Sequence, residues 1–235
     1  MTRKTKSGAT PLSFFRVCGL AALGFAAAIV AANAIAVPAG LPTTGAGTAE
    51  VTAFFGEQGG VADLSSALTP LAWVLATLFG AGAVAATWRS ERERGEAWAL
   101  VGFAGLVLQN TTFAGIVALR LALASMPLDE PAVTAAVWAV HEGFFTLNGT
   151  FLALALLGLS VAGRRGGLIR PWHAALGLVS AALMLASSVL APLVIEHGNP
   201  LGLIGLVGWL LWVVWVCAYG VVLVRLPSLR APAAV

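Results

Sequence analysis

Charged residues are scarce in this sequence. Only 10% of its 235 residues are Asp, Glu, Lys or Arg, and 59% are hydrophobic, whereas soluble proteins usually contain about 25% charged and about 45–50% apolar residues. The mean hydropathy is +0.93. A water-soluble core could not hold so many apolar side chains. The composition therefore predicts a membrane protein and leaves no room for a soluble catalytic domain.

Residue types that build common catalytic and cofactor sites are also few. Cys18 and Cys217 are the only cysteines, and both lie in apolar segments, which excludes a disulfide framework, a redox pair and a zinc knuckle. Lys4 and Lys6 are the only lysines, so a retinal Schiff base within the membrane is excluded. The sequence has no serine nucleophile motif, zinc protease motif or glycine-rich phosphate loop. We therefore expect neither a metal site nor a cofactor.

Long apolar runs, separated by short polar turns, make up most of the chain. About 20 mainly apolar residues in an α-helix cross a hydrocarbon layer about 30 Å thick, because the helix satisfies its own backbone groups. We predict an all-α fold, a polytopic transmembrane helical bundle of six spans that forms one domain over residues 1–235. The expected spans are about 14–37, 71–87, 98–126, 133–161, 174–195 and 201–224.

The N-terminal third leaves one question open. The basic start and the triplet Ala32-Asn33-Ala34 fit a cleaved signal peptide, but the apolar run exceeds the usual length of about 7–15 residues, so we favour a retained helix. Residues 38–68, rich in turn formers, are expected to be an external loop. Within this loop, the helical spacing of Val51, Phe54 and Phe55 favours a short helix lying flat at the interface.

The positions of the positive charges predict the orientation. Of the 13 Lys and Arg residues, 12 lie in the N-terminal stretch, the loops between spans two and three and spans four and five, and the C-terminal end. Such loops stay in the cytoplasm. Both termini are therefore expected to be cytoplasmic, in a plasma membrane such as the bacterial inner membrane. This distribution accounts for the net charge of +3, so nucleic-acid binding is not expected.

Three ionisable residues fall inside predicted spans. These are Arg120 in the third span and His141 and Glu142 in the fourth. Such residues cost roughly 2.5–3.5 kcal/mol on insertion scales and often mark function. The tight turn at residues 127–131 makes the two spans antiparallel neighbours, and Arg120 and Glu142 then lie at similar depth. We expect these two to form an ion pair, which leaves His141 free to titrate.

The preferred functional interpretation is a polar pocket between spans three and four that binds or transports a small or amphiphilic ligand. The residues expected to bound it are Gln109, Asn110, Arg120, His141, Glu142 and Asn148. One alternative is an intramembrane enzyme with His141 or Glu142 as general acid or base. Another is that these residues are purely structural and hold the two helices together.

A third alternative is an accessory subunit of a membrane complex. Membrane lipids are expected partners in any case. The sixth span contains Gly202, Gly205 and Gly208, and small residues at such spacing allow close helix contact. This helix is therefore a candidate for contact with a second copy or another membrane protein.

Several short segments, most of them in the last third of the chain, combine apolar residues with glycine, proline or tryptophan. The segments are GLIRPWHAALG at 167–177, GWLLWVVWV at 208–216 and LVR at 223–225, with EVTAFFG at 50–56 and GFF at 143–145. In these features the chain resembles a large group of uncharacterised actinobacterial six-helix membrane proteins over nearly its full length. The resemblance implies six helices and a bacterial plasma membrane, and it implies no site or activity.

Overall fold

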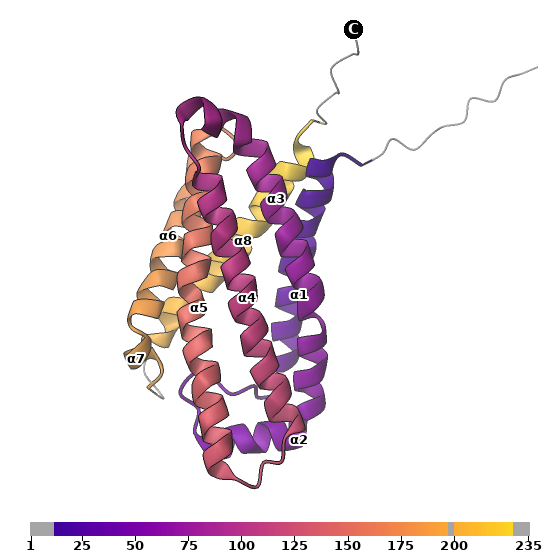
Figure 1. The fold of residues 1–235 in the computed structure, drawn as a ribbon, viewed down its shortest axis with the longest axis vertical. Coiled ribbons are helices and arrows are strands. Elements are labelled where there is room, and N and C mark those ends of the chain that lie inside the picture. Colours follow the sequence, from indigo (N-terminus) through magenta and orange to yellow (C-terminus); the bar gives the residue numbers. More distant parts are fainter. Residues whose placement is uncertain (1–11, 197–199, 228–235) are drawn as a thin grey trace, which may run out of the picture.

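The computed structural model describes residues 12–196 and 200–227, and every regular element in this part of the chain is helical (Figure 1). The helices are α1 (Phe14–Ala36), α2 (Thr48–Ala67), α3 (Thr69–Arg94), α4 (Trp98–Ser125), α5 (Pro131–Arg165), α6 (Pro171–Val189), α7 (Ala191–Val194) and α8 (Gly202–Arg225). Among the described residues, six helical segments are long and apolar enough to cross a membrane. The protein is therefore a multi-pass α-helical membrane protein, as the composition predicted.

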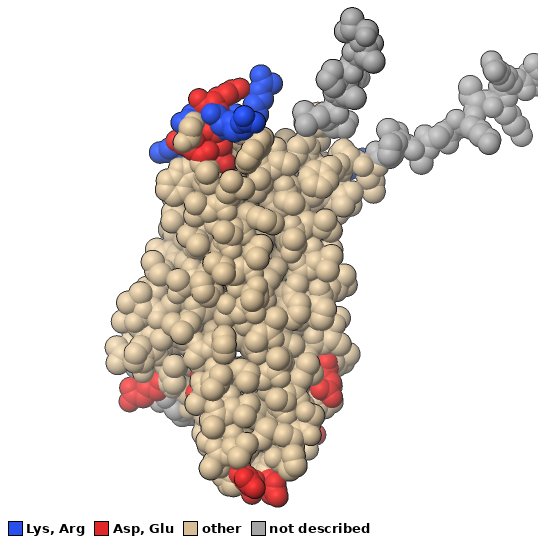
Figure 2. Space-filling model, in the orientation of Figure 1, with Lys and Arg blue, Asp and Glu red and all other residues tan. Residues whose placement is uncertain are grey.

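The two ends of the bundle differ in charge. One end, which we call the basic end, holds both ends of the described chain and the α3–α4 and α5–α6 connections (Figure 1). In Figure 2 basic and acidic side chains gather there, whereas the opposite end shows only acidic ones. We call that opposite end the acidic end. The positive-inside rule predicts that the basic end is the cytoplasmic one.

Most of the expected external loop is helical. Residues 48–67 form α2, which bends at Gln58, where φ is −120° and ψ is 22°. The half before the bend lies across the acidic end, and the half after it runs on into α3 (Figure 1). The first half is helical because Phe54 and Phe55 pack against Leu123 of α4 and Trp138 of α5. The boundaries 38–68 for a loop were therefore wrong, and the predicted interfacial helix is longer than expected.

Helices α4 and α5 are held in register by backbone contact near the basic end. A Cβ atom added at Gly158 would lie 2.3 Å from the backbone nitrogen of Gly102, and one at Gly105 would lie 2.5 Å from that of Ala155. Such distances require glycine at these positions, since any side chain would force the helices apart. This close packing fixes which residues of the antiparallel helices α4 and α5 lie opposite each other.

The glycines of α8 pack mainly inside the bundle. A Cβ atom at Gly205 would meet Ser187 of α6, and one at Gly208 would meet Met184 of the same helix. For Gly202, no described residue lies within 4 Å of such an atom. Contact of this helix with a second copy or another membrane protein stays a prediction, and Gly202 is the glycine that the fold leaves open for it.

Candidate functional site

Arg120 binds His141, and the expected pair with Glu142 is not formed. The Nε atom of Arg120 donates a hydrogen bond to Nε2 of His141 over 3.0 Å. Because a guanidinium has only donors, this His141 nitrogen must be the acceptor, which places the proton of a neutral imidazole on Nδ1. The prediction of an Arg120–Glu142 ion pair was therefore wrong by one residue along α5.

Glu142 is turned toward a different part of the chain. Its Oε1 atom accepts a hydrogen bond from the backbone N–H of Gly45, which lies in the connection between α1 and α2. Neighbouring residues on a helix point about 100° apart, so His141 and Glu142 cannot both face Arg120. Gly45 has a φ of +85°, a conformation that favours glycine. This hydrogen bond from Gly45 to Glu142 thus joins the α1–α2 connection to α5.

Aromatic stacking fixes the orientation of the His141 ring. The ring lies 4.4 Å from that of Trp138 with an interplanar angle of 13°, and 6.1 Å from that of Phe145 with an angle of 11°. These residues are three before and four after His141 on α5, which places all three on one helix face. The imidazole is held between two aromatic planes, and its Nε2 atom points at α4.

The groups left unpaired around this contact are donors. The Nδ1 atom of His141 is buried and has no hydrogen-bond partner among the described residues. The Nε1 atom of Trp138 is also buried, but it faces the Glu142 carboxylate as a donor and is therefore not free for a ligand. Among the described residues, no hydrogen bond reaches the terminal nitrogens of Arg120. We call Arg120, Trp138 and His141 the Arg120 cluster, and its chemistry suits an anion.

No acidic side chain in the described part of the chain lies within 4.0 Å of the Arg120 guanidinium. The ion pairs found there join Arg89 to Glu93, and Arg94 and Arg165 to Glu96, all at the basic end. Arg120 is therefore a positive charge within a predicted span that no carboxylate of this region neutralises.

The three amide residues lie deeper in the bundle than the Arg120 cluster. Asn110 donates from Nδ2 to the carbonyl oxygen of Trp73 over 3.4 Å, so it faces α3. Gln109 and Asn148 are buried, and each has a side-chain oxygen without a partner among the described residues. From Gln109 to Arg120 is about 16 Å along the helix. The structure thus joins Arg120 to His141, with Glu142 adjacent, and spreads the predicted set over several turns.

The depth of the cluster follows from the length of α5. This helix has 35 residues, or about 52 Å at a rise of about 1.5 Å per residue, whereas the hydrocarbon layer is about 30 Å thick. If Arg164 and Arg165 mark the cytoplasmic boundary, the layer ends about 20 residues earlier, near Thr146. His141 and its partner Arg120 then lie at the level of the lipid headgroups, where polar and apolar groups meet.

A second group of polar residues, which sequence reasoning did not select, is buried near the basic end. His173 is hydrogen-bonded through Nε2 to the carbonyl oxygen of Trp215 at 3.0 Å, and its ring packs on that of Tyr219. Ser160 Oγ and Tyr219 Oη are buried without partners in the described region. The available signal was Tyr219, the only tyrosine of the chain, placed in an apolar span.

Glu91 is the buried carboxylate of the basic end. It is 1% exposed, and its two oxygens accept the backbone N–H of Ala99 at 3.0 and 3.2 Å. This N–H lies in the first turn of α4, where helices leave backbone donors unpaired and favour negative charge. Glu91 therefore caps α4, and its role is structural.

No protein-family model, curated protein or solved structure matches this chain. The resemblance to actinobacterial six-helix membrane proteins stays a prediction. What the protein does must therefore be inferred from its own residues, of which the Arg120 cluster is the most informative.

Proposed function

We propose that the protein binds a small or amphiphilic ligand with an anionic group at the Arg120 cluster, between α4 and α5. The observation that carries this proposal is the guanidinium of Arg120, which no carboxylate of the described residues neutralises and which donates its one hydrogen bond in that part of the chain to a neutral ring. At headgroup level water can hydrate this charge, and the guanidinium offers a fork of donors that no carboxylate of the described residues occupies. A bound anion would fit that fork.

The donors at the cluster suggest a carboxylate or a phosphate. A guanidinium presents a planar fork of donors that matches two oxygens of either group. The buried Nδ1 of His141 points away from Arg120, on the other edge of the ring from Nε2, so the guanidinium is the group that an anion would contact. The nearby carboxylate of Glu142 would repel an anion, but its Oε1 is bound to Gly45, on a different side of α5 from Arg120.

An amphiphile fits the depth of the cluster. At headgroup level an anionic group can stay hydrated while an attached chain enters the hydrocarbon layer. Next to His141, α5 exposes Val140 by 50% and Phe144 by 43%. These side chains offer apolar surface to such a chain. Transport of the ligand across the membrane would extend this proposal, and Gln109, Asn110 and Asn148 are the polar groups along its path.

The other interpretations are less well supported. Catalysis with His141 or Glu142 as general acid or base would need one of these groups free to face a substrate, whereas His141 accepts from Arg120 and Glu142 accepts from Gly45. A purely structural role for Arg120 would leave a guanidinium without an acidic partner. The plasma membrane of a bacterium remains our proposed location, on the strength of the basic cytoplasmic loops.

Thermal unfolding with defined amphiphiles tests the proposal. The protein, purified in a non-ionic detergent, is heated with laurate, lauryl phosphate, lauryl alcohol or inorganic phosphate, and tryptophan fluorescence reports its unfolding. We expect the two anionic amphiphiles to raise the unfolding temperature and the alcohol to leave it unchanged. Stabilisation by inorganic phosphate alone would identify a soluble anion as the ligand class.

Arg120→Gln should abolish the stabilisation, and Arg120→Lys should retain part of it because the charge remains without the fork. Arg89→Gln is the matched control, since Arg89 is exposed at the basic end and pairs only with Glu93 in the described region. Equal stabilisation by laurate and lauryl alcohol, or an unchanged response in Arg120→Gln, would refute the proposed site.

A further inference from the structure

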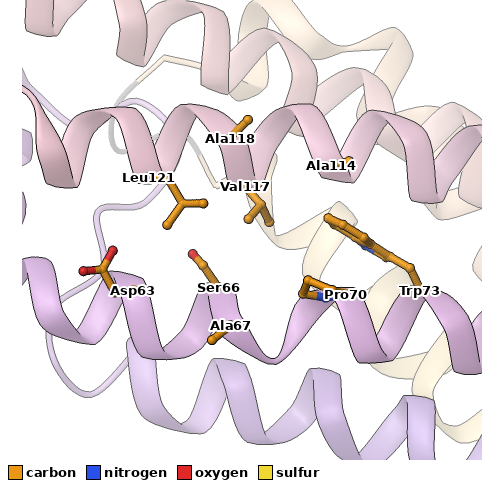
Figure 3. Close-up of a pocket in the computed structure, with 9 residues that line it drawn as sticks. All are labelled: Asp63, Ser66, Ala67, Pro70, Trp73, Ala114, Val117, Ala118 and Leu121. Carbon is orange, nitrogen blue, oxygen red and sulfur yellow. The ribbon is translucent and has the colours of Figure 1, made fainter.

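A groove opens between the α2–α3 segment and α4 on the acidic half of the bundle. Its volume is about 500 Å³. Figure 3 shows Val117 and Leu121 of α4 along one wall, and Pro70 and Trp73 of α3 on the other, with the Trp73 indole reaching toward α4. Most of this lining is apolar, as expected for a surface that faces lipid chains.

The groove has a polar end formed by two residues of α2. Asp63 is exposed and has no ion-pair partner in the described part of the chain. Ser66 is only 6% exposed, and its hydroxyl is unpaired among the described residues. Figure 3 shows both side chains directed toward α4. They are three residues apart, so they share one helix face. Together they present hydrogen-bond acceptors at one end of the apolar groove.

This polar end lies at headgroup level. The 25 residues from Asp63 to Trp88, which precedes the basic loop, span about 37 Å along the helix, more than the hydrocarbon thickness of about 30 Å. Trp73 lies about 15 Å deeper than Asp63. The groove therefore runs from the headgroup region into the hydrocarbon layer, with its carboxylate at the outer end.

We propose that this groove binds a membrane phospholipid with a primary-amine headgroup. One acyl chain lies along Val117 and Leu121, and the ammonium group donates hydrogen bonds to the Asp63 carboxylate and the Ser66 hydroxyl. A choline headgroup carries the same positive charge but has no N–H donor, so it cannot satisfy the buried Ser66 oxygen. The amine lipid is accordingly preferred over the choline lipid.

A second groove provides an internal comparison. It lies between α3 and α4 toward the basic end, has a volume of about 470 Å³, and includes Ala81 and Phe103 in its lining. None of its lining residues is acidic or carries a hydroxyl. It therefore represents a lipid-facing hollow of similar size without the polar end, and it should hold lipids without regard to the headgroup.

Native mass spectrometry of the full chain tests the proposal. The protein in a mild detergent receives equal amounts of phosphatidylethanolamine and phosphatidylcholine with identical acyl chains. We expect one tightly held phosphatidylethanolamine, retained about tenfold more than phosphatidylcholine, the factor typical of one hydrogen bond to a charged group. Asp63→Asn and Ser66→Ala should each reduce this preference, and Ala114→Phe, which fills the groove, should remove the bound lipid.

Matched variants make the outcome decisive. Ala81→Phe fills the second groove, and Asp129→Asn removes an exposed carboxylate at the acidic end outside the first one; both should leave the preference intact. Equal retention of the two lipids, or a preference that survives both Asp63→Asn and Ala114→Phe, would overturn the proposal. This site is independent of the Arg120 cluster, since Arg120→Gln should leave the amine-lipid preference unchanged.

Discussion

Glu142 shows how a single side chain can connect distant parts of this molecule. Its hydrogen bond with Gly45 joins residues 97 positions apart and holds the α1–α2 connection against α5. A backbone donor bonded to a carboxylate contributes more than a neutral pair, because the acceptor is charged. The connection is therefore held over the acidic end by this carboxylate together with the packing of Ala39, Leu41 and Ala46 on the apolar cluster there.

Glu142→Ala should free the α1–α2 connection. The Gly45 N–H would lose its acceptor, which we expect to destabilise the protein by about 1–3 kcal/mol and to speed amide hydrogen exchange in residues 37–47. Hydrogen exchange followed by mass spectrometry measures this directly. Asp129→Asn, at an exposed site of the same end, should leave exchange in that segment unchanged. Unaltered exchange in Glu142→Ala would show that the bond does not hold the connection.

The partner of Arg120 could be predicted only approximately. Arg120 reaches α5 at the expected level because the turn at residues 127–131 sets the antiparallel register. Which of the neighbouring residues His141 and Glu142 it meets depends on a rotation of about 100° around α5. The backbone N–H of Gly45, which takes Glu142 as its acceptor, lies far away in the sequence. Spacing within the two helices contains no information on that third segment.

Among the elements, α4 and α5 depend most on small residues. Gly158→Ala should destabilise the protein by about 1–3 kcal/mol or more, because the new Cβ atom would meet backbone atoms of Gly102 at 2.3 Å and 2.5 Å. Gly143→Ala is the matched control on the same helix, where a Cβ atom meets nothing within 4 Å. It should be neutral, or stabilising by up to about 1 kcal/mol. Unfolding free energies in detergent distinguish the two, and equal values would contradict the close packing.

The α3–α4 connection is tied to the end of α5 by Glu96. The hydrogen bond from Arg94, at 3.1 Å, lowers the pKa of Glu96 below its ordinary value of 4.5, and the nearby Arg165 lowers it further. A lowered pKa in the folded state stabilises the protein above pH 4.5, and this contribution is lost as the pH falls below that value. Glu96→Gln should therefore weaken the acid dependence of unfolding.

Glu93→Gln serves as the control for that measurement, since Glu93 pairs with Arg89 within α3 and both side chains are largely exposed. The comparison requires the unfolding free energy as a function of pH from about 3 to 7, which covers the range where carboxylates titrate. The same acid dependence in Glu96→Gln and the unaltered protein would argue against a stabilising role for the Glu96 contacts.

The helix α2 shows where element prediction reached its limit. Its glycines and polar residues favoured a loop, and only Val51, Phe54 and Phe55 indicated a helix. The surface that receives these side chains includes Leu123 and Trp138, which come from helices much later in the chain. Because burial against them stabilises α2, its length could not be read from its own residues.

At the scale of the whole molecule, six spans were predictable because each apolar run satisfies its own backbone hydrogen bonds in lipid. The separation of basic residues to one end of the bundle could also be predicted from the sequence, and Figure 2 shows it on one face of the molecule. The buried group around His173 and Tyr219 was not predictable, because it requires knowing which helices pack together. Hydropathy determines how many helices there are, whereas packing determines which residues meet.

Cysteine labelling tests the orientation. In a background with Cys18→Ala and Cys217→Ala, a cysteine at Asp129 should react with a membrane-impermeant thiol reagent added outside intact cells. A cysteine at Arg92 should react only after the membrane is opened, because the positive-inside rule predicts a cytoplasmic basic end. The reverse pattern would invert the topology and place the Arg120 cluster on the cytoplasmic side.

The most direct test of the central claim is to locate a bound anionic amphiphile. The probe is lauryl phosphate with a photoreactive diazirine near its head, cross-linked to the protein in detergent and mapped by mass spectrometry. We predict cross-links on α4 and α5 near Arg120 and His141, saturable by unlabelled lauryl phosphate and lost in Arg120→Gln. Cross-links scattered over the lipid-facing surface, with the same yield in Arg120→Gln, would contradict anion binding at this cluster.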